Sequence, residues 1–324
     1  MFDIPVVLFL FRRIKAVEIV KRIAEVKPAR LYLLSDQGRT DEEKAQVTAC
    51  RKAVEEAIDW DCEIIRNYAD ENRGVYGNIG EGAKWVFQRE ENAIFLEDDN
   101  LPEVSFFQYC KDLLIRYADE PKILWICGTN YLGEYDNPDA DYMFTRHLLP
   151  CGWASWSKKF LQFYDGELKN CSDSRNIKIA GKRYYNKMLF VQYRHQWLCE
   201  YSRIIKGVRP RSWDYQMDFT LKYNDLYGIS PVKNQIRNIG VDEISEHGGV
   251  SYSNVMTDRF CSMPSYPLSS PLRHPKKLNI CEDYEKKIAK ILQFPLNSWI
   301  KLAISDAIKH LMHRPLDEPL RKQL

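Results

Sequence analysis

The sequence predicts an α/β protein in which a mixed, Rossmann-like sheet is flanked by helices and followed by a helical C-terminal extension. Over the first 130 residues, short apolar runs alternate with segments of helical periodicity, a pattern typical of βαβ units. The fourth apolar run ends in three consecutive carboxylates, the position at which open α/β sheets bind ligands. The tail over 282–314 has helical periodicity throughout.

The predicted strands are short and almost wholly apolar, as parallel strands buried on both faces are. They occupy 5–11, 30–35, 62–66, 92–97 and 122–128. Helices are expected between them at 14–27, 41–58, 78–90 and 103–118. Pro28 ends the first helix, and Gly38 marks a turn after the second strand.

Beyond residue 130 the pattern is less regular. Residues 130–180 are rich in aromatics, a helix is expected around 183–203, and a late strand lies within 226–241. Prolines spread through 250–280 predict an extended segment. In the tail, apolar residues recur every four positions from Trp299 and Ile300 to Leu311 and Met312. We expect this stripe to dock on the main body. The alternative is that 297–314 forms a helix that lies on a membrane surface.

Composition excludes several classes of protein. The net charge of the 324 residues is +2 and no long basic run is present, so nucleic acid is not an expected partner. Nine cysteines without a CxxC pair argue against a zinc ribbon or a disulfide framework and favour a reducing compartment. The apolar run at 4–11 lies between Asp3 and Arg12-Arg13, unlike a signal peptide. A cytoplasmic protein is expected, at most peripheral at the inner face of the membrane.

The three carboxylates are Glu97, Asp98 and Asp99. Neighbouring carboxylates repel one another unless a cation lies among them, and hard oxygen ligands suit Mg²⁺ or Mn²⁺. The alternative is a solvated acidic turn before a helix that begins at Pro102.

Five blocks of sequence, in order over about residues 5–250, carry a resemblance to a known family. They are Phe11-Arg12 with Lys27-Pro28, 31–36 and Arg39; Asn72-Arg73-Gly74 with Trp85, 94–99, 101–102 and 106–107; 142–146 with Gly152-Trp153-Ala154-Ser155-Trp156; Trp213-Asp214-Tyr215-Gln216; and Asn238-Ile239-Gly240 with His247. Together they resemble the bacterial GT-A-fold glycosyltransferases described as family-2-like or nucleotide-diphospho-sugar transferases. The resemblance implies a GT-A domain over 1–250, with a nucleotide-binding half to about 130 and an acceptor half after it; 251–324 would form an extended wrap and helical tail.

The resemblance implies a DXD-like metal site. Asp99 would be the direct ligand of Mn²⁺ or Mg²⁺, with Asp98 or Glu97 reaching the ribose or a metal-bound water. His247 would be the second metal ligand or a phosphate contact, since imidazole serves both purposes. The cation would neutralise the departing diphosphate.

Asp214 is the expected general base, because transfer to a hydroxyl needs a carboxylate within hydrogen-bond reach. Trp213 and Tyr215 beside it would desolvate it partly and raise its pKa. One base in a direct displacement implies inversion at the anomeric carbon. The alternative is a helix N-cap, which Ser212 and Asp214 both suit.

The resemblance also implies further contacts to the nucleotide-sugar donor. Arg12 and Asp36 end the first two strands, where the family holds the nucleotide base, and Asp36 would accept from a uracil ring N–H. Asn72 and Arg73 would contact ribose or phosphate. Gly152, Trp153 and Trp156 would form the floor of the sugar or acceptor site, although a core role is as plausible for Trp156.

The chain departs from the family pattern at three places. Arg13 stands where a proline is common, Gln37-Gly38 replaces a Gly-Pro pair, and Met217 stands where an aromatic is usual. These departures affect the shape of the loops, the choice of nucleotide-sugar donor and the side of the site that would bind the acceptor.

The leading hypothesis is therefore a metal-dependent inverting glycosyltransferase. It would move a sugar from a nucleotide-sugar donor, UDP-linked by analogy with the family, to a cell-surface glycan or lipid-linked acceptor in polysaccharide biosynthesis. One alternative is a sugar-1-phosphate nucleotidyltransferase, against which the glycine-free Phe11-Arg12-Arg13-Ile14 counts. The other is a non-catalytic carbohydrate-binding protein.

Overall fold

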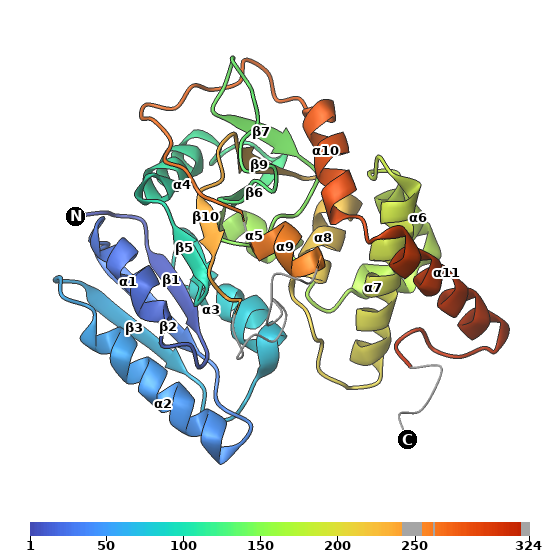
Figure 1. The fold of residues 1–324 in the computed structure, drawn as a ribbon, viewed down its shortest axis with the longest axis horizontal. Coiled ribbons are helices and arrows are strands. Elements are labelled where there is room, and N and C mark those ends of the chain that lie inside the picture. Colours follow the sequence, from blue (N-terminus) through green and yellow to red (C-terminus); the bar gives the residue numbers. More distant parts are fainter. Residues whose placement is uncertain (242–254, 262, 319–324) are drawn as a thin grey trace.

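The computed structural model describes residues 1–241, 255–261 and 263–318 (Figure 1). Its centre is an eight-stranded sheet in the order β3-β2-β1-β4-β8-β6-β9-β7. The strands are β1 (Val6–Leu10), β2 (Arg30–Ser35), β3 (Glu63–Tyr68), β4 (Asn92–Glu97), β6 (Ile123–Cys127), β7 (Tyr142–Thr145), β8 (Trp153–Trp156) and β9 (Tyr227–Pro231). β3, β2, β1 and β4 are parallel, whereas β8 is antiparallel to both of its neighbours. The predicted mixed α/β sheet is confirmed.

Helices cover both faces of this sheet, which explains why its inner strands β1, β4 and β6 are almost wholly apolar. On one face, alternate residues of β1, β2 and β4 pack against α1 (Ala16–Ala24), α2 (Asp41–Glu56) and α4 (Val104–Arg116). On the other face, the intervening residues pack against α3 (Gly82–Phe87), α5 (Ser157–Phe163), α8 (Asp214–Tyr223) and α10 (Glu282–Leu292). The predicted helix at 78–90 is in fact a π-helical turn, η1 (Tyr76–Glu81), followed by α3.

Two further features lie beyond the central layers. A smaller cluster joins the short 3₁₀ helix η2 (Lys169–Ser172), α6 (Ser174–Gly181) and α7 (Lys187–Ile205) to α8 around Trp197 and Phe219. Strands β5 (Asn100–Pro102) and β10 (Ile236–Asn238) form a separate antiparallel pair, in which Asn238 faces Asn100. Ile239 also donates its backbone N–H to the carbonyl of Asp99, so this pair fixes the chain directly after the three carboxylates.

The central sheet is continuous across the division expected near residue 130. β8 lies between β4 and β6, and β9 pairs with β6, so strands from both sides of residue 130 alternate in one sheet. Within the predicted extended segment at 250–280, residues Val255–Cys261 are instead helical (α9). The cause is local: this stretch holds none of the segment's prolines, which begin at Pro264.

The tail forms two helices, α10 and α11 (Leu296–Leu311), because Pro295 interrupts the pattern between them. α11 does dock on the main body, on α7, but not through its apolar stripe. Trp299 donates its indole N–H to the carbonyl of Met188 (3.0 Å), and Asp306 pairs with His195 (2.8 Å). Most of the stripe is exposed instead. Among the described residues, no helix has the length and apolar character needed to cross a bilayer.

Candidate functional site

A cavity of about 840 Å³ opens where β1, β2 and β4 end. Its walls include Phe11 and Asp36, which directly follow β1 and β2, and Glu97, the last residue of β4. α7, α8 and the segments on either side of α11 complete it. The cavity therefore lies at the carboxyl ends of parallel strands, the usual ligand position in such sheets.

The three carboxylates lie together at the end of β4, and two of them share one guanidinium. Arg13 Nη1 contacts Asp98 Oδ1 (2.9 Å) and Asp99 Oδ2 (3.1 Å). Asp98 Oδ2 also accepts from the backbone N–H of Phe11 (3.2 Å), and Asp99 Oδ1 accepts from Asn100 Nδ2 (2.6 Å). These contacts hold both carboxylates at the floor of the cavity.

Glu97 differs from its neighbours, since within the described part of the chain its carboxylate has no hydrogen bond or ion pair. Burial raises its pKa well above the ordinary value, and the charges of Asp99, Asp98 and Asp214 raise it further. Burial and Asp99 also raise the pKa of Asp98 to about 6, although Arg13 opposes this. Mutual repulsion of this kind among neighbouring carboxylates is relieved by a bound cation.

The donor set fits a hard divalent cation, because it consists of carboxylate oxygens. Glu97 and Asp99 would hold the ion, with Asp98 beside them. Among the described residues, no three His, Cys, Asp or Glu side chains already form a metal-binding group. Arg13 occupies the space between two of the carboxylates, so an ion would have to compete with it. His247, the predicted second ligand, lies outside the described residues.

Arg13→Met is expected to strengthen Mn²⁺ binding in the absence of nucleotide by at least about tenfold, because it removes the competing charge. The same change should lower the free energy of unfolding without metal by about 3 kcal/mol, since it removes the guanidinium that contacts both partly buried carboxylates. Electron paramagnetic resonance and urea denaturation measure the two effects. Arg22→Met, which breaks an exposed pair with Glu25, is the matched control. Unchanged or weaker Mn²⁺ binding in Arg13→Met would contradict the competition.

Binding of Mn²⁺ is expected to strengthen as the pH rises from 5 to 7, by up to about tenfold per pH unit below 6. The pKa of Asp98 is raised from 3.8 to about 6, so below pH 6 a proton occupies the site that the cation needs. Without metal, the folded protein keeps this proton where the unfolded chain releases it. The contribution of Asp98 to stability therefore falls as the pH rises from about 4 to 6. A metal titration repeated at each pH checks the trend, and pH-independent affinity would contradict it.

Asp214 is the first residue of α8 and lines the same cavity. Ser212 donates to its carboxylate and accepts from the backbone N–H of Tyr215 (3.1 Å). The hydroxyl of Ser212 thus satisfies an N–H of the first turn, the capping role considered for Asp214. Burial raises the pKa of Asp214, opposed by the hydrogen bond from Ser212. Its charge contributes to the raised pKa of Glu97, which places the two carboxyl groups within electrostatic reach of each other.

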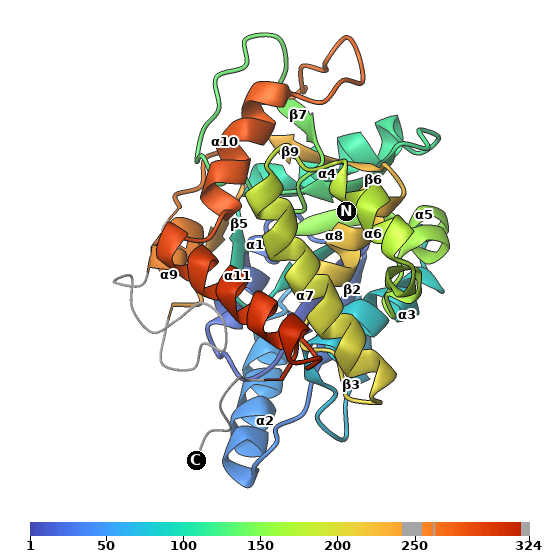
Figure 2. The same ribbon diagram turned by 90° about the vertical axis from the view of Figure 1, so that its right-hand side faces the viewer.

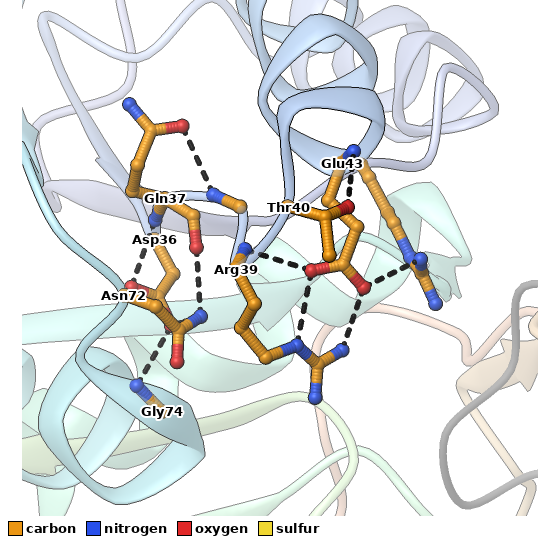
Figure 3. Close-up of polar contacts among 9 residues, drawn as sticks. Asp36, Gln37, Arg39, Thr40, Glu43, Asn72 and Gly74 are labelled. Atoms are coloured by element: carbon orange, nitrogen blue, oxygen red, sulfur yellow. Dashed lines mark hydrogen bonds and ion pairs between the residues drawn. The ribbon is translucent and has the colours of Figure 1, made fainter.

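Asp36 organises the loop that follows β3 (Figure 3). Its carboxylate accepts from the backbone N–H groups of Gln37 (2.8 Å), Arg73 (2.6 Å) and Gly74 (2.9 Å), and from Asn72 Nδ2 (3.1 Å). Four donors occupy the acceptor positions of a carboxylate, so none is left for a uracil N–H, contrary to expectation. Asn72 and Gly74 line the cavity. Arg73 is not among the lining residues; its guanidinium bonds Asn67 and the carbonyl of Ser35 instead.

Two arginines at the cavity wall share one carboxylate, Glu43 of α2 (Figure 3). Arg12 Nη1 lies 2.9 Å from Glu43 Oε1, and Arg39 Nη2 lies 2.8 Å from the same oxygen. These cations lower the pKa of Glu43 to about 2, Arg39 having the larger effect. Thr40 caps α2 through the backbone N–H of Glu43 (3.2 Å), which fixes Glu43 where it meets both arginines. Arg12 therefore lines the cavity close to the end of β1.

The predicted aromatic floor belongs to the protein core. Trp153 is stacked between Phe95 (ring centroids 3.9 Å apart) and Trp125 (4.3 Å), and it does not line the cavity. Gly152 has φ +60°, and a Cβ there would lie 2.5 Å from Ile236. Trp156 is also buried and donates to the carbonyl of Leu114 (2.9 Å). All three residues therefore lie beneath the site, because β8 inserts between two other strands.

Sequence reasoning missed the cavity wall that α7 supplies. Gln192, Tyr193, His195, Cys199 and Arg203 all line it. Gln192, His195, Cys199 and Arg203 recur every three or four positions, which places them on one helix face, and Tyr193 is adjacent to Gln192. This periodicity was visible in the sequence, but an ordinary buried face has the same pattern.

No protein-family model matches the chain, and no curated protein matches it. Among solved structures, 4-diphosphocytidyl-2C-methyl-D-erythritol synthase from Anaerococcus prevotii is 12% identical with a TM-score of 0.34, over 53% of this chain and 76% of that one. UDP-glucose pyrophosphorylase with UDP-glucose is 9% identical, TM-score 0.35, over 72% and 92% of the two chains. Its apo form is 8% identical, TM-score 0.35, over 72% and 93%. Likeness this low carries no argument about reaction or substrate, which must come from the site.

Proposed function

We propose that this protein is a metal-dependent inverting glycosyltransferase that uses a nucleotide-sugar donor, with UDP as the expected nucleotide. The observation that supports this most is that one cavity holds both a cluster of carboxylates and a separate carboxylate. Glu97, Asp98 and Asp99 form a cluster suited to a cation, and Asp214 faces the same space with a raised pKa. A sugar transfer from a diphosphate to a hydroxyl needs both groups.

In the proposed reaction, Asp214 accepts the proton of the acceptor hydroxyl as its oxygen attacks the anomeric carbon. The bond from that carbon to the diphosphate oxygen breaks, and the nucleoside diphosphate leaves with the bonding electrons. Attack opposite the leaving group inverts the anomeric configuration. When bound at Glu97 and Asp99, a divalent cation supplies charge neutralisation to the diphosphate. Arg12 and Arg39 at the cavity wall are placed to attract the same anion.

Sugar-1-phosphate nucleotidyl transfer is the second candidate, and it is the reaction class of the pyrophosphorylase among the similar structures. In that reaction the nucleophile is a phosphate oxygen, which is already ionised and needs no general base. Asp214 therefore has no evident task in it. Nor does a glycine-rich turn follow β1, where Arg13 instead extends its side chain to Asp98 and Asp99. A carbohydrate-binding protein without catalysis would require neither the acidic cluster nor Asp214.

The acceptor is proposed to be a cell-surface glycan or a lipid-linked glycan, and the site of action the cytoplasm. All nine cysteines are free thiols, which supports a reducing compartment.

Product analysis distinguishes these candidates. The protein is incubated with Mn²⁺ and UDP-sugars plus alkyl glycoside acceptors, and separately with UTP plus sugar-1-phosphates. We expect UDP release that depends on the acceptor, with an inverted anomeric signal by NMR. Pyrophosphate release from UTP would establish the second candidate instead, and binding without either product would support the third.

A further inference from the structure

The outward face of α11 carries a line of exposed apolar side chains, here termed the apolar ridge. It consists of Leu296, Ile300, Ile304, Ile308, Leu311 and Met312, which are 38 to 79% exposed. Their spacing of three or four residues places them on one side of the helix. Soluble proteins rarely expose apolar side chains contiguously unless the surface meets a partner.

Polar contacts fix the ridge in this outward position. On the inner side of α11, Asp306 pairs with His195 of α7 at 2.8 Å. At its end, Lys309 is buried and donates to the carbonyl of Leu316 (2.6 Å), and Asp317 pairs with Lys206 of α7 (2.9 Å). Turning the ridge inward would break these pairs, so packing among the described residues leaves the ridge uncovered.

α7, on which α11 packs, and the neighbouring α6 carry a concentration of positive charge. Residues 174–211, which include α6 and α7, contain ten Lys and Arg residues and one acidic residue, Glu200, although the net charge of the whole chain is only +2. Lys178, Lys182, Lys187 and Arg194 are among the exposed ones. α6, α7 and α11 lie on the same side of the molecule, to the right in Figure 1 and towards the viewer in Figure 2.

We propose that this face docks on an anionic lipid bilayer. The apolar ridge would enter the boundary between headgroups and acyl chains, and the basic side chains would contact the headgroups. A second copy of the chain would bring two strongly basic faces together, which electrostatics disfavours. A nucleic acid would satisfy the charge but offers no apolar layer for the ridge.

The docked helix lies beside the cavity. Leu292 and Phe294 before α11, and Leu316 and Asp317 after it, all line the cavity. A membrane-anchored hydroxyl acceptor would therefore reach Asp214 from the bilayer side. This consequence for the acceptor rests on the proposed glycosyl transfer, whereas the docking itself does not.

Co-sedimentation of the full chain with vesicles tests the docking. We expect the wild type to bind vesicles that contain phosphatidylglycerol and not pure phosphatidylcholine, with binding that weakens as salt is added. The double variant Ile304→Glu/Ile308→Glu should bind at least about tenfold less. Ile115→Glu, which changes a still more exposed isoleucine on α4, should bind as the wild type does.

Three results would overturn the proposal: no binding to anionic vesicles, equal binding by the double variant, or a wild-type dimer in light scattering that the double variant abolishes. UDP-sugar binding is measured on the same three proteins, and we expect it to be equal in all of them. Vesicle binding by a wild type that binds no nucleotide sugar would leave the docking intact and remove the proposed function.

Discussion

Asp214→Asn is expected to lower the rate of sugar transfer by a factor on the order of 10² to 10⁴ while donor binding stays unchanged. The amide keeps the shape of the side chain and can still accept from Ser212, but it cannot take a proton from an acceptor hydroxyl. Burial raises the pKa of Asp214, which makes the wild-type carboxylate a stronger base than an exposed one.

Single-turnover transfer and calorimetric donor binding separate the two quantities. Asp119→Asn, an exposed carboxyl in the turn after α4, is the matched control and should retain full transfer. Wild-type transfer by Asp214→Asn would remove Asp214 as the base. Loss of donor binding in that variant would instead assign Asp214 to the donor.

Asp99→Asn is expected to weaken Mn²⁺-dependent UDP-sugar binding by at least about a hundredfold, because it removes one charged oxygen ligand from a hard cation. We expect the loss to come from the missing charge alone, because neighbouring residues hold the Asp99 side chain in place. Arg13 and Asn100 hold it, and Gly240 lies so close that a side chain there would overlap it.

Calorimetric titration with and without EDTA measures the loss. The control, Asp41→Asn, alters a fully exposed carboxylate at the start of α2 and should bind as the wild type does. If EDTA leaves wild-type UDP-sugar binding unchanged, the metal has no part in donor binding. If Asp99→Asn keeps metal-dependent binding, another residue holds the ion.

The sequence predicted the parallel half of the fold well, because strands buried on both faces are continuous apolar runs that end at polar turns. β2 and β4 have the predicted bounds, and β1, β3 and β6 differ by one or two residues. Since parallel strands end at a common edge, Arg12, Asp36 and Glu97 were expected to meet there, and all three line one cavity.

The remaining errors come from contacts between residues far apart in the chain. Nothing local shows that β8 inserts between β4 and β6, which turns Trp153 from a cavity wall into core. Asp36 was expected to be free for a nucleotide, but it binds Asn72, 36 residues later. In α11, periodicity identified the apolar face but not its direction, which the pairs of Asp306 and Lys309 decide.

Arg13 is another residue whose contacts could not be predicted from the sequence. Its departure from the family pattern was evident in the sequence, but its consequence was not. Only the structure shows its guanidinium between Asp98 and Asp99, where it acts as a counter-ion within the chain.

Anomalous X-ray diffraction at the manganese edge, from crystals grown with Mn²⁺ and UDP, tests the metal–nucleotide site most directly. We predict one strong peak in the cavity, within coordination distance of Asp99 or Glu97 oxygens and of the diphosphate. UDP bound in the cavity without manganese beside it, or manganese bound only elsewhere, would contradict the account.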